Sequence, residues 1–142
     1  MTQYVLDTDH LSLYERRHPQ VCDRILRSRQ NLTEHLMVTV ISVEEQYAGR
    51  LAQIRKASTS EALVAGYRRL QLTYDLFFNL PVLQYDFNAD QKFHEFRSMG
   101  IWIGTQDLRI ASIVLAHEGI LLTRNLRDFE KVPGLRIEDW SV

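Results

Sequence analysis

The sequence predicts an α/β fold in which helices cover both faces of a mostly parallel sheet. Short apolar runs rich in β-branched residues alternate along the chain with longer segments of helical periodicity. No Asn-Gly or similar signal for a tight hairpin joins neighbouring runs. Strands that alternate with helices and lack tight turns form β-α-β units, so we expect the strands to pair in parallel.

Four segments have the composition of buried strands. They are "QYVLD" at residues 3–7, "LMVTVI" at 36–41, "LPVLQY" at 80–85 and "GILLTR" at 119–124. Each run is apolar, contains β-branched residues and is too short to be a stable helix. These four segments predict the strands of one sheet.

Six segments between and beside these runs have helical periodicity. They are residues 11–17, 21–29, 43–55, 61–78, 89–99 and 107–117. The third and fourth form a helical hairpin, at about residues 43–79, inserted between the second and third strands. The polar stretch "RKASTSEAL" predicts the turn, with Ser58 or Ser60 capping the second helix. Such a hairpin is often a binding surface for a partner or second subunit, although ordinary packing is an equal explanation.

Length and composition predict a single domain over residues 1–142. The 45% hydrophobic and 25% charged residues are typical of a globular protein. Cys22 is the only cysteine, which excludes an internal disulfide and a thiolate zinc site and fits a cytoplasmic setting. Every apolar run is too short to span a membrane, so we expect no membrane partner.

The net charge of −1 gives no overall attraction to nucleic acid, so a polyanion would need a local basic patch. Arginines account for 14 of the 17 basic residues, and the planar guanidinium suits phosphate. Solvated helix faces are the simpler explanation of these arginines.

Acidic residues gather where the predicted strands end, which is where parallel α/β sheets bind ligands. They are Asp7 and Asp9 after the first strand, Glu44 and Glu45 after the second, Asp128 after the fourth, and Asp107 at the start of the helix before the fourth. We therefore expect several carboxylates at one edge of the sheet.

Helix capping is the alternative explanation for most of these acids. Three pairs have the spacing of helix-start residues: Ser42 with Glu45, Asn125 with Asp128, and Thr105 with Asp107. Taken singly, each acid fits a helix start better than a ligand site. Asp7 differs, because it ends a predicted strand and has less local reason to carry a carboxylate.

Convergence of these carboxylates favours a bound cation. Neighbouring carboxylates repel one another and raise their own pKa values unless a cation is present. A set of oxygen ligands suits Mg²⁺ or Mn²⁺ better than zinc. The five histidines show no metal-ligand spacing, so we expect them at the surface or in caps: His10, His18, His35, His94 and His117. Trp102 and Trp140 are expected to be core or interface anchors.

Three stretches in a fixed order carry a family resemblance. They are "YVLDTDHLSL" near the N-terminus, "ISVEEQYAGRL" from residue 41, and "IGTQDLRIASIVLAHEGILLTRNLRDFEKVPGLRIEDW" near the C-terminus. Together they resemble the PIN-domain ribonucleases, specifically the VapC-like toxins of bacterial toxin–antitoxin pairs. The resemblance spans nearly the whole chain and implies a three-layer α/β/α domain with a sheet of four to five strands.

The resemblance implies a catalytic set of acids. It makes Asp7, Glu45 and Asp107 the metal ligands, with Glu45 in the family's Glu-x-x-x-Gly pattern. The fourth acidic position falls in "TRNLRDF", where Asn125 and Asp128 both qualify.

Further residues have supporting roles under the same resemblance. Thr123 matches the family's hydroxyl beside the metal, while Asp9 and Glu44 are acidic neighbours of the ligands. The implied activity is Mg²⁺-dependent endonucleolytic cleavage of RNA, such as tRNA, by water that the metal activates. The family also implies a small antitoxin that covers the site, and a homodimer.

Two other functions compete with this interpretation. "DTDHL" resembles the first motif of haloacid-dehalogenase-like phosphatases, but Leu11 stands where that motif has Thr or Val, and the later Lys and Gly-Asp-x-x-x-Asp elements are missing. A PIN-like domain that binds RNA or a partner without cutting it is the second alternative. Unused acids at Asp7, Glu45 and Asp107 argue against it, because like charges held together cost stability.

Overall fold

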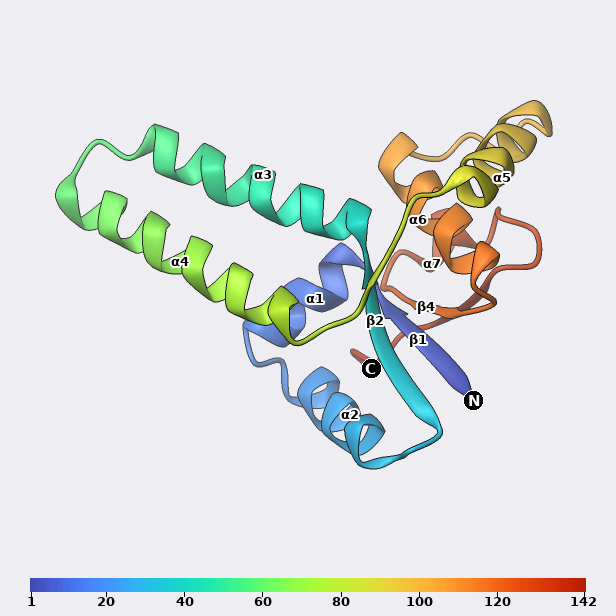
Figure 1. Ribbon diagram of the computed structural model, residues 1–142, viewed down its shortest axis with the longest axis horizontal. Helices are drawn as coiled ribbons and strands as arrows, with labels where there is room; N and C mark the ends of the chain where they lie inside the picture. The colour runs from blue at the N-terminus through green and yellow to red at the C-terminus, as the bar shows by residue number, and fades with distance from the viewer.

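The computed structural model describes residues 1–142 and contains one parallel sheet flanked by helices (Figure 1). The strand order is β3-β2-β1-β4-β5, and every neighbouring pair is parallel. The strands are β1 (Thr2–Leu6), β2 (Glu34–Thr39), β3 (Val82–Leu83), β4 (Ile120–Leu122) and β5 (Arg136–Glu138). The predicted α/β class and parallel sheet are therefore confirmed.

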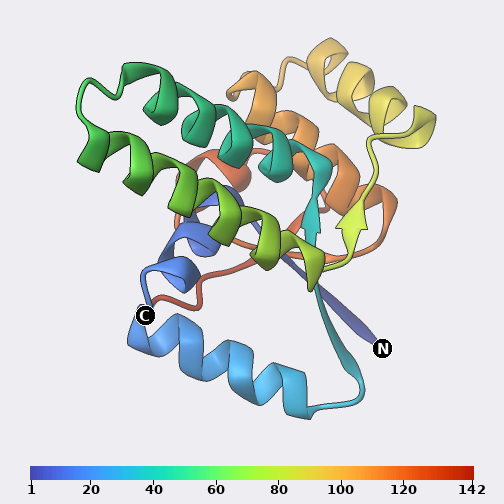
Figure 2. The same cartoon turned by 60° about the vertical axis from the view of Figure 1, so that its left-hand side comes forward.

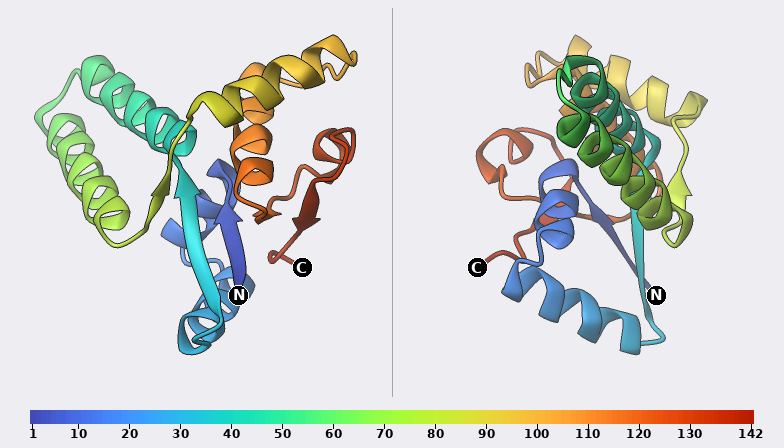
Figure 3. Two further views of the ribbon diagram at one scale, coloured as in Figure 1. Left: turned by 45° about the vertical axis from the view of Figure 1, so that its right-hand side comes forward. Right: turned by 90° about the vertical axis from the view of Figure 1, so that its left-hand side faces the viewer.

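Helices lie on both sides of the sheet, as Figures 2 and 3 show. They are α1 (Thr8–Glu15), α2 (Pro19–Gln30), α3 (Val40–Lys56), α4 (Ser60–Phe78), α5 (Phe87–Ser98), α6 (Thr105–Ala116) and α7 (Leu126–Phe129). None of them combines the length and apolar character needed to cross a membrane.

Alternation along the strands divides the core into two halves. Tyr4 and Leu6 of β1 point to one face and pack with buried side chains of α1 and α2. Val5, between them, points to the other face and packs with α5 and α6. The expected three-layer arrangement follows directly from this alternation.

The helical hairpin predicted near residues 43–79 consists of α3 and α4, which extend away from the sheet (Figure 1). The two helices approach closely at Gly66, where an added Cβ would lie 3.0 Å from Cγ1 of Ile54. Thr59 caps α4, accepting a hydrogen bond from the Ala62 amide, so the predicted capping by Ser58 or Ser60 was wrong.

The boundary between β2 and α3 differs from the predicted one. The strand expected over residues 36–41 ends at Thr39, and Val40 already begins the helix. Thr39 Oγ1 accepts a hydrogen bond from the Ser42 amide at 3.2 Å and is the N-cap. The predicted Ser42–Glu45 capping box is therefore wrong, because both residues lie inside α3. A side-chain cap outweighed the β propensity of the Val-Ile pair.

Strand β5 was not predicted, and of helix α7 only the start at Asn125 was. Helix α7 has four residues and strand β5 has three, which is too few to produce a recognisable period. Strand β3 also shrinks to two residues of the six expected. The short strands β3 and β5 lie at the edges of the sheet.

The strand order reverses between β1 and β4. From β1 the chain adds β2 and β3 on one side, and then β4 and β5 on the other. A crevice forms beyond the carboxyl ends of two strands at such a switch point. Asp7 marks this place, since its amide donates to the Leu122 carbonyl of β4 at 3.1 Å.

Candidate active site

A cleft of about 360 Å³ opens at this switch point. Its lining is mostly polar and includes four acids and one arginine: Asp7, Thr8, Asp9, Ser12, Arg16, Glu45, Asp107, Asn125 and Phe129. The structure thus brings together the three expected ligands Asp7, Glu45 and Asp107, although they are far apart in the sequence.

Asp7 is both a candidate metal ligand and a helix cap, two roles that the sequence analysis treated as alternatives. It is buried, and it is the N-cap of α1, with Oδ1 accepting from the His10 amide at 2.9 Å. The expectation that Asp7 has no helix-start role is therefore wrong. Burial, followed by the hydrogen bond and charge of Asp9, raises the pKa of Asp7 to about 9. A hydrogen bond from Thr123 opposes this rise.

Asp9 lies beside Asp7 and is only partly buried. Burial alone would raise the pKa of Asp9, but hydrogen bonds with His10 and Asp7 outweigh burial and lower it. Its Oδ1 lies 2.9 Å from His10 Nδ1, and Oδ2 accepts from the Arg124 amide at 3.4 Å. The two neighbouring carboxyl groups therefore influence each other's ionisation.

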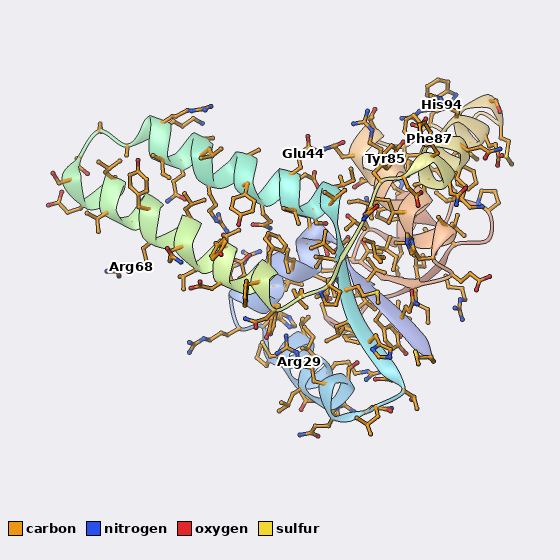
Figure 4. The ribbon with its side chains drawn as sticks, viewed as in Figure 1. Arg29, Glu44, Arg68, Tyr85, Phe87 and His94 are labelled. Atoms are coloured by element: carbon orange, nitrogen blue, oxygen red, sulfur yellow. The ribbon has the colours of Figure 1, made fainter.

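Glu45 projects from the second turn of α3 toward α1. Thr8 Oγ1 donates to Glu45 Oε1 at 2.7 Å, and it also lies 3.2 Å from Ser42 Oγ. Because α3 begins at Val40, Glu45 faces the cleft from the helix interior and not from a cap. Glu44 lies on the outer side, where it is exposed and accepts from Gln106 Nε2 at 2.8 Å (Figure 4).

Asp107 occupies the first turn of α6, where the helix dipole favours a carboxylate. The helix begins after Gly104, so Thr105 is its first residue and not a side-chain cap. Burial raises the pKa of Asp107, and the charges of Glu45, Asp128 and Asp9 raise it further. Four carboxyl groups from separate parts of the chain therefore interact electrostatically.

The segment after β4 contributes Thr123, Asn125 and Asp128. Asn125 lines the cleft, and as N-cap of α7 it accepts from the Asp128 amide at 3.4 Å, which confirms the predicted helix start. Its amide Nδ2 donates to Asp128 Oδ2 at 3.1 Å. Asp128 itself stands outside the lining and lies 3.8 Å from Lys131 Nζ. Thr123 is fully buried, and its side chain forms a hydrogen bond with Asp7.

The donor set of the cleft fits a divalent cation. None of Asp7, Asp9, Glu45 and Asp107 forms a salt bridge with a lysine or arginine. Carboxylates that repel one another without a basic partner are the arrangement that a cation stabilises. All-oxygen ligands of this kind suit a hard cation.

A second groove of about 420 Å³ adjoins the acidic cleft and shares Ser12 and Arg16 with it. Arg50 and Arg69 line this groove from α3 and α4. Arg50 is held in place by hydrogen bonds to Glu15 at 3.3 Å and to Thr73. Positive charge thus lies directly beside the acidic cleft, in a chain whose net charge is close to zero.

Sequence reasoning missed two contributors to the site. His10 was expected at the surface or in a cap, but its side chain is fully buried and contacts Asp9. Thr8 was overlooked because a Thr at a helix start usually signals only local structure. The contact between Thr8 and Glu45 links residues 37 positions apart, so no local pattern reports it. Of the two tryptophans, Trp140 is buried as expected, whereas Trp102 is exposed.

The chain is similar in sequence to known ribonucleases. No protein-family model matches the chain. It is 30% identical to the tRNA(fMet)-specific endonuclease VapC of Salmonella typhimurium over 145 residues, covering 99% of each protein. It is also 30% identical to ribonuclease VapC2 of Haemophilus influenzae over 144 residues, again covering 99% of each.

Solved structures agree with the fold. The chain superposes with a TM-score of 0.77 on a chain of the DNA-bound VapBC complex of Salmonella typhimurium, at 26% identity and covering 99% of each. The TM-score is 0.76 for the promoter-bound VapBC2 complex of Rickettsia felis, at 21% identity and covering 98% of this chain and 99% of that one. The full-length sequence relatives, together with this fold, show that the chain belongs to the VapC family of ribonucleases.

Proposed function

We propose that this protein is the toxin of a toxin–antitoxin pair and an endoribonuclease that requires Mg²⁺, or Mn²⁺ in its place. The observation that carries the proposal is the convergence on one cleft of Asp7, Glu45 and Asp107, none of which forms a salt bridge with a lysine or arginine. The VapC relatives, named as a ribonuclease and a tRNA-specific endonuclease, support RNA, and tRNA in particular, as substrate. We further interpret residues 1–142 as one PIN domain that works in the cytoplasm.

In this proposal Asp7, Glu45 and Asp107 hold the cation, and Asp9 and Asn125 complete the polar lining. Of the two candidates for the fourth position, the cleft favours Asn125, while Asp128 acts through its charge and its hydrogen bond to Asn125. When bound, such a cation acidifies water and neutralises charge on a phosphodiester.

Neighbouring groups of the protein hold the three acids in the cleft. The cap bond to the His10 amide fixes Asp7, and the Thr8 hydroxyl fixes Glu45. The dipole of α6 favours the ionised form of Asp107 at the helix start. These fixed positions lower the reorganisation needed when an anionic phosphate enters the cleft.

The arginine groove supports an RNA substrate. A scissile phosphate in the acidic cleft would place flanking phosphates beside Arg16, with Arg50 and Arg69 farther along the groove. Guanidinium groups suit phosphate oxygens and would offset the repulsion between RNA and the acids. Binding would therefore weaken with rising salt concentration.

The partners that we propose are an antitoxin and a second copy of the chain. The solved relatives are VapBC complexes, which supports a small protein partner. Helices α3 and α4 also expose many apolar side chains: Leu51, Leu63, Val64, Tyr67, Leu72, Tyr74 and Phe78. An exposed apolar surface of this kind favours a protein contact.

The proposal is tested by incubating purified, antitoxin-free protein with total cellular RNA and Mg²⁺ and sequencing the fragment ends. Asp107→Asn is the test variant, and Asp75→Asn on α4, outside the cleft, is the matched control. We expect discrete ends from wild type and Asp75→Asn and none from Asp107→Asn. Intact RNA with folded wild-type protein would favour a domain that binds RNA without cutting it.

A further inference from the structure

The side chain of His10 is fully buried, unlike those of the other four histidines. Both of its ring nitrogens are engaged: Nδ1 lies 2.9 Å from Asp9 Oδ1, and Nε2 lies 3.0 Å from the backbone nitrogen of Trp140. A buried polar group with both partners satisfied is costly to disturb. His10 therefore links an acid of the cleft to the end of the chain.

The Trp140 amide determines which ring nitrogen carries the proton. A backbone N–H can only donate, so Nε2 must accept, and the proton of the neutral ring lies on Nδ1. Nδ1–H then donates to Asp9 Oδ1. Asp139 Oδ1 lies 3.5 Å from Nε2, but it already accepts from the Ser141 amide and hydroxyl at 2.8 and 2.6 Å.

Trp140, which donates to His10, is itself held in place by several contacts. Its ring packs against Tyr4 of β1 at a centroid distance of 4.8 Å, and the Arg24 guanidinium of α2 lies 4.4 Å from its centroid. The indole Nε1 donates to Glu138 Oε1 at 3.1 Å. The segment after β5 thus returns to α1 and α2, where Figure 2 shows the C-terminus.

We propose that His10 is a positioning residue, which fixes the Asp9 carboxylate at the cleft and ties it to the C-terminal segment at Trp140. Atoms of Asp7, Asp9 and His10 lie within 4.8 Å of one another, yet His10 is no ligand, because neither ring nitrogen has a free lone pair. The orienting role rests on the proposed function, in which Asp9 belongs to the cation site. Removing a residue that hydrogen-bonds to a metal ligand typically lowers metal affinity about 10- to 100-fold.

Two amide variants separate the two hydrogen bonds of His10. The Asn side chain reaches about as far as Nδ1, so His10→Asn can keep the bond to Asp9 and lose the one to Trp140. The Gln side chain reaches about as far as Nε2, so His10→Gln can keep the bond to Trp140 and lose the one to Asp9. Both variants lose the packing of the imidazole ring. Thermal unfolding is therefore used to check that the two variants have similar stability.

The first measurement is Mn²⁺ affinity of the purified chain by calorimetry, without RNA. We expect His10→Gln to bind Mn²⁺ at least about 10-fold more weakly than His10→Asn, at similar stability. Equal affinities in the two variants would overturn the positioning role and leave His10 as a packing residue.

The second measurement is the tautomer of His10 in the wild-type protein, from two-bond ¹H–¹⁵N correlations, together with hydrogen exchange of the Trp140 amide. We expect the Nδ1–H form and slow exchange. A His10 ring protonated at Nε2, or a rapidly exchanging Trp140 amide, would contradict the proposed link from Asp9 through His10 to Trp140. If the wild type binds no Mn²⁺, the proposed cation site fails, whereas the tautomer and the exchange rate still decide whether His10 joins Asp9 to Trp140.

Discussion

Thr8 Oγ1 donates a 2.7 Å hydrogen bond to Glu45 Oε1, which joins the first turn of α1 to α3 across the cleft. In Thr8→Val the side chain keeps its shape but cannot donate, so Glu45 loses the group that orients it. We expect kcat/KM for RNA cleavage to fall by about 10-fold or more. Thr8→Ser, which keeps the hydroxyl, should stay much closer to wild type. Equal loss in both variants would mean that packing, and not the hydrogen bond, matters at this position.

Asp7 makes the metal-free protein less stable as the pH rises. Its pKa of about 9 in the folded protein exceeds the ordinary value of 3.8, so the folded state holds the proton more tightly than the unfolded state. This contribution to stability is complete below pH 3.8 and is lost as the pH rises to about 9.

Asp7→Asn cannot ionise, yet its amide oxygen can still accept the cap hydrogen bond from His10. We expect this variant to gain on the order of 2 kcal/mol of unfolding free energy over wild type at pH 8 in EDTA. The gain should vanish near pH 4, and Mg²⁺ should stabilise only the wild type. Urea titrations at several pH values provide the measurement. Parallel stability profiles for the two proteins would contradict the assigned environment of Asp7.

Arg69 and Arg68 are adjacent on α4 but lie on different sides of the helix. Arg69 lines the groove beside the acidic cleft, whereas Arg68 projects outward (Figure 4). We expect Arg69→Ala to raise KM for RNA several-fold with kcat little changed, and to reduce the salt dependence of binding by about one charge. Arg68→Ala should match wild type in both respects. If neither variant changes KM, the RNA follows another path, and the groove is available for an acidic segment of the antitoxin.

Gly66 and Gly49 provide a matched test of the hairpin. An added Cβ at Gly66 would meet Ile54 Cγ1 at 3.0 Å, whereas nothing lies within 4 Å of the same position at Gly49. Gly49→Ala should therefore stabilise α3 by about 0.5–1 kcal/mol. Gly66→Ala should unfold at lower temperature than Gly49→Ala, because α3 and α4 must separate slightly. Equal melting temperatures would contradict the close packing at Gly66.

The parts of the fold that the sequence predicted are those with a strong local period. The buried strand that precedes Asp7 and the long helices α3 and α4 are examples. The sequence predicts too late a start for α3 because the cap Thr39 lies within a β-branched run that favours a strand. Short elements such as α7 and β5 depend on tertiary contacts and leave no period to detect.

The candidate site, like the fold, was predictable from the sequence only in part. Parallel topology was enough to predict that acids after separate strands meet at one edge, and Asp7, Glu45 and Asp107 do line one cleft. Orientation was not predictable, because it depends on contacts between distant positions. His10 is the clearest case, since its partner Trp140 lies 130 residues away. A lone His in a sequence carries no sign of such a partner.

The most direct test of the cation-dependent nuclease is RNA cleavage by wild type and Asp7→Asn, each with Mg²⁺ and with EDTA. Because Asp7→Asn is expected to be at least as stable as the metal-free wild type, lost activity in this variant cannot be attributed to unfolding. We predict discrete fragments only from wild type with Mg²⁺. Cleavage that persists in Asp7→Asn, or in wild type with EDTA, would contradict the assignment of Asp7 as a ligand of a catalytic cation.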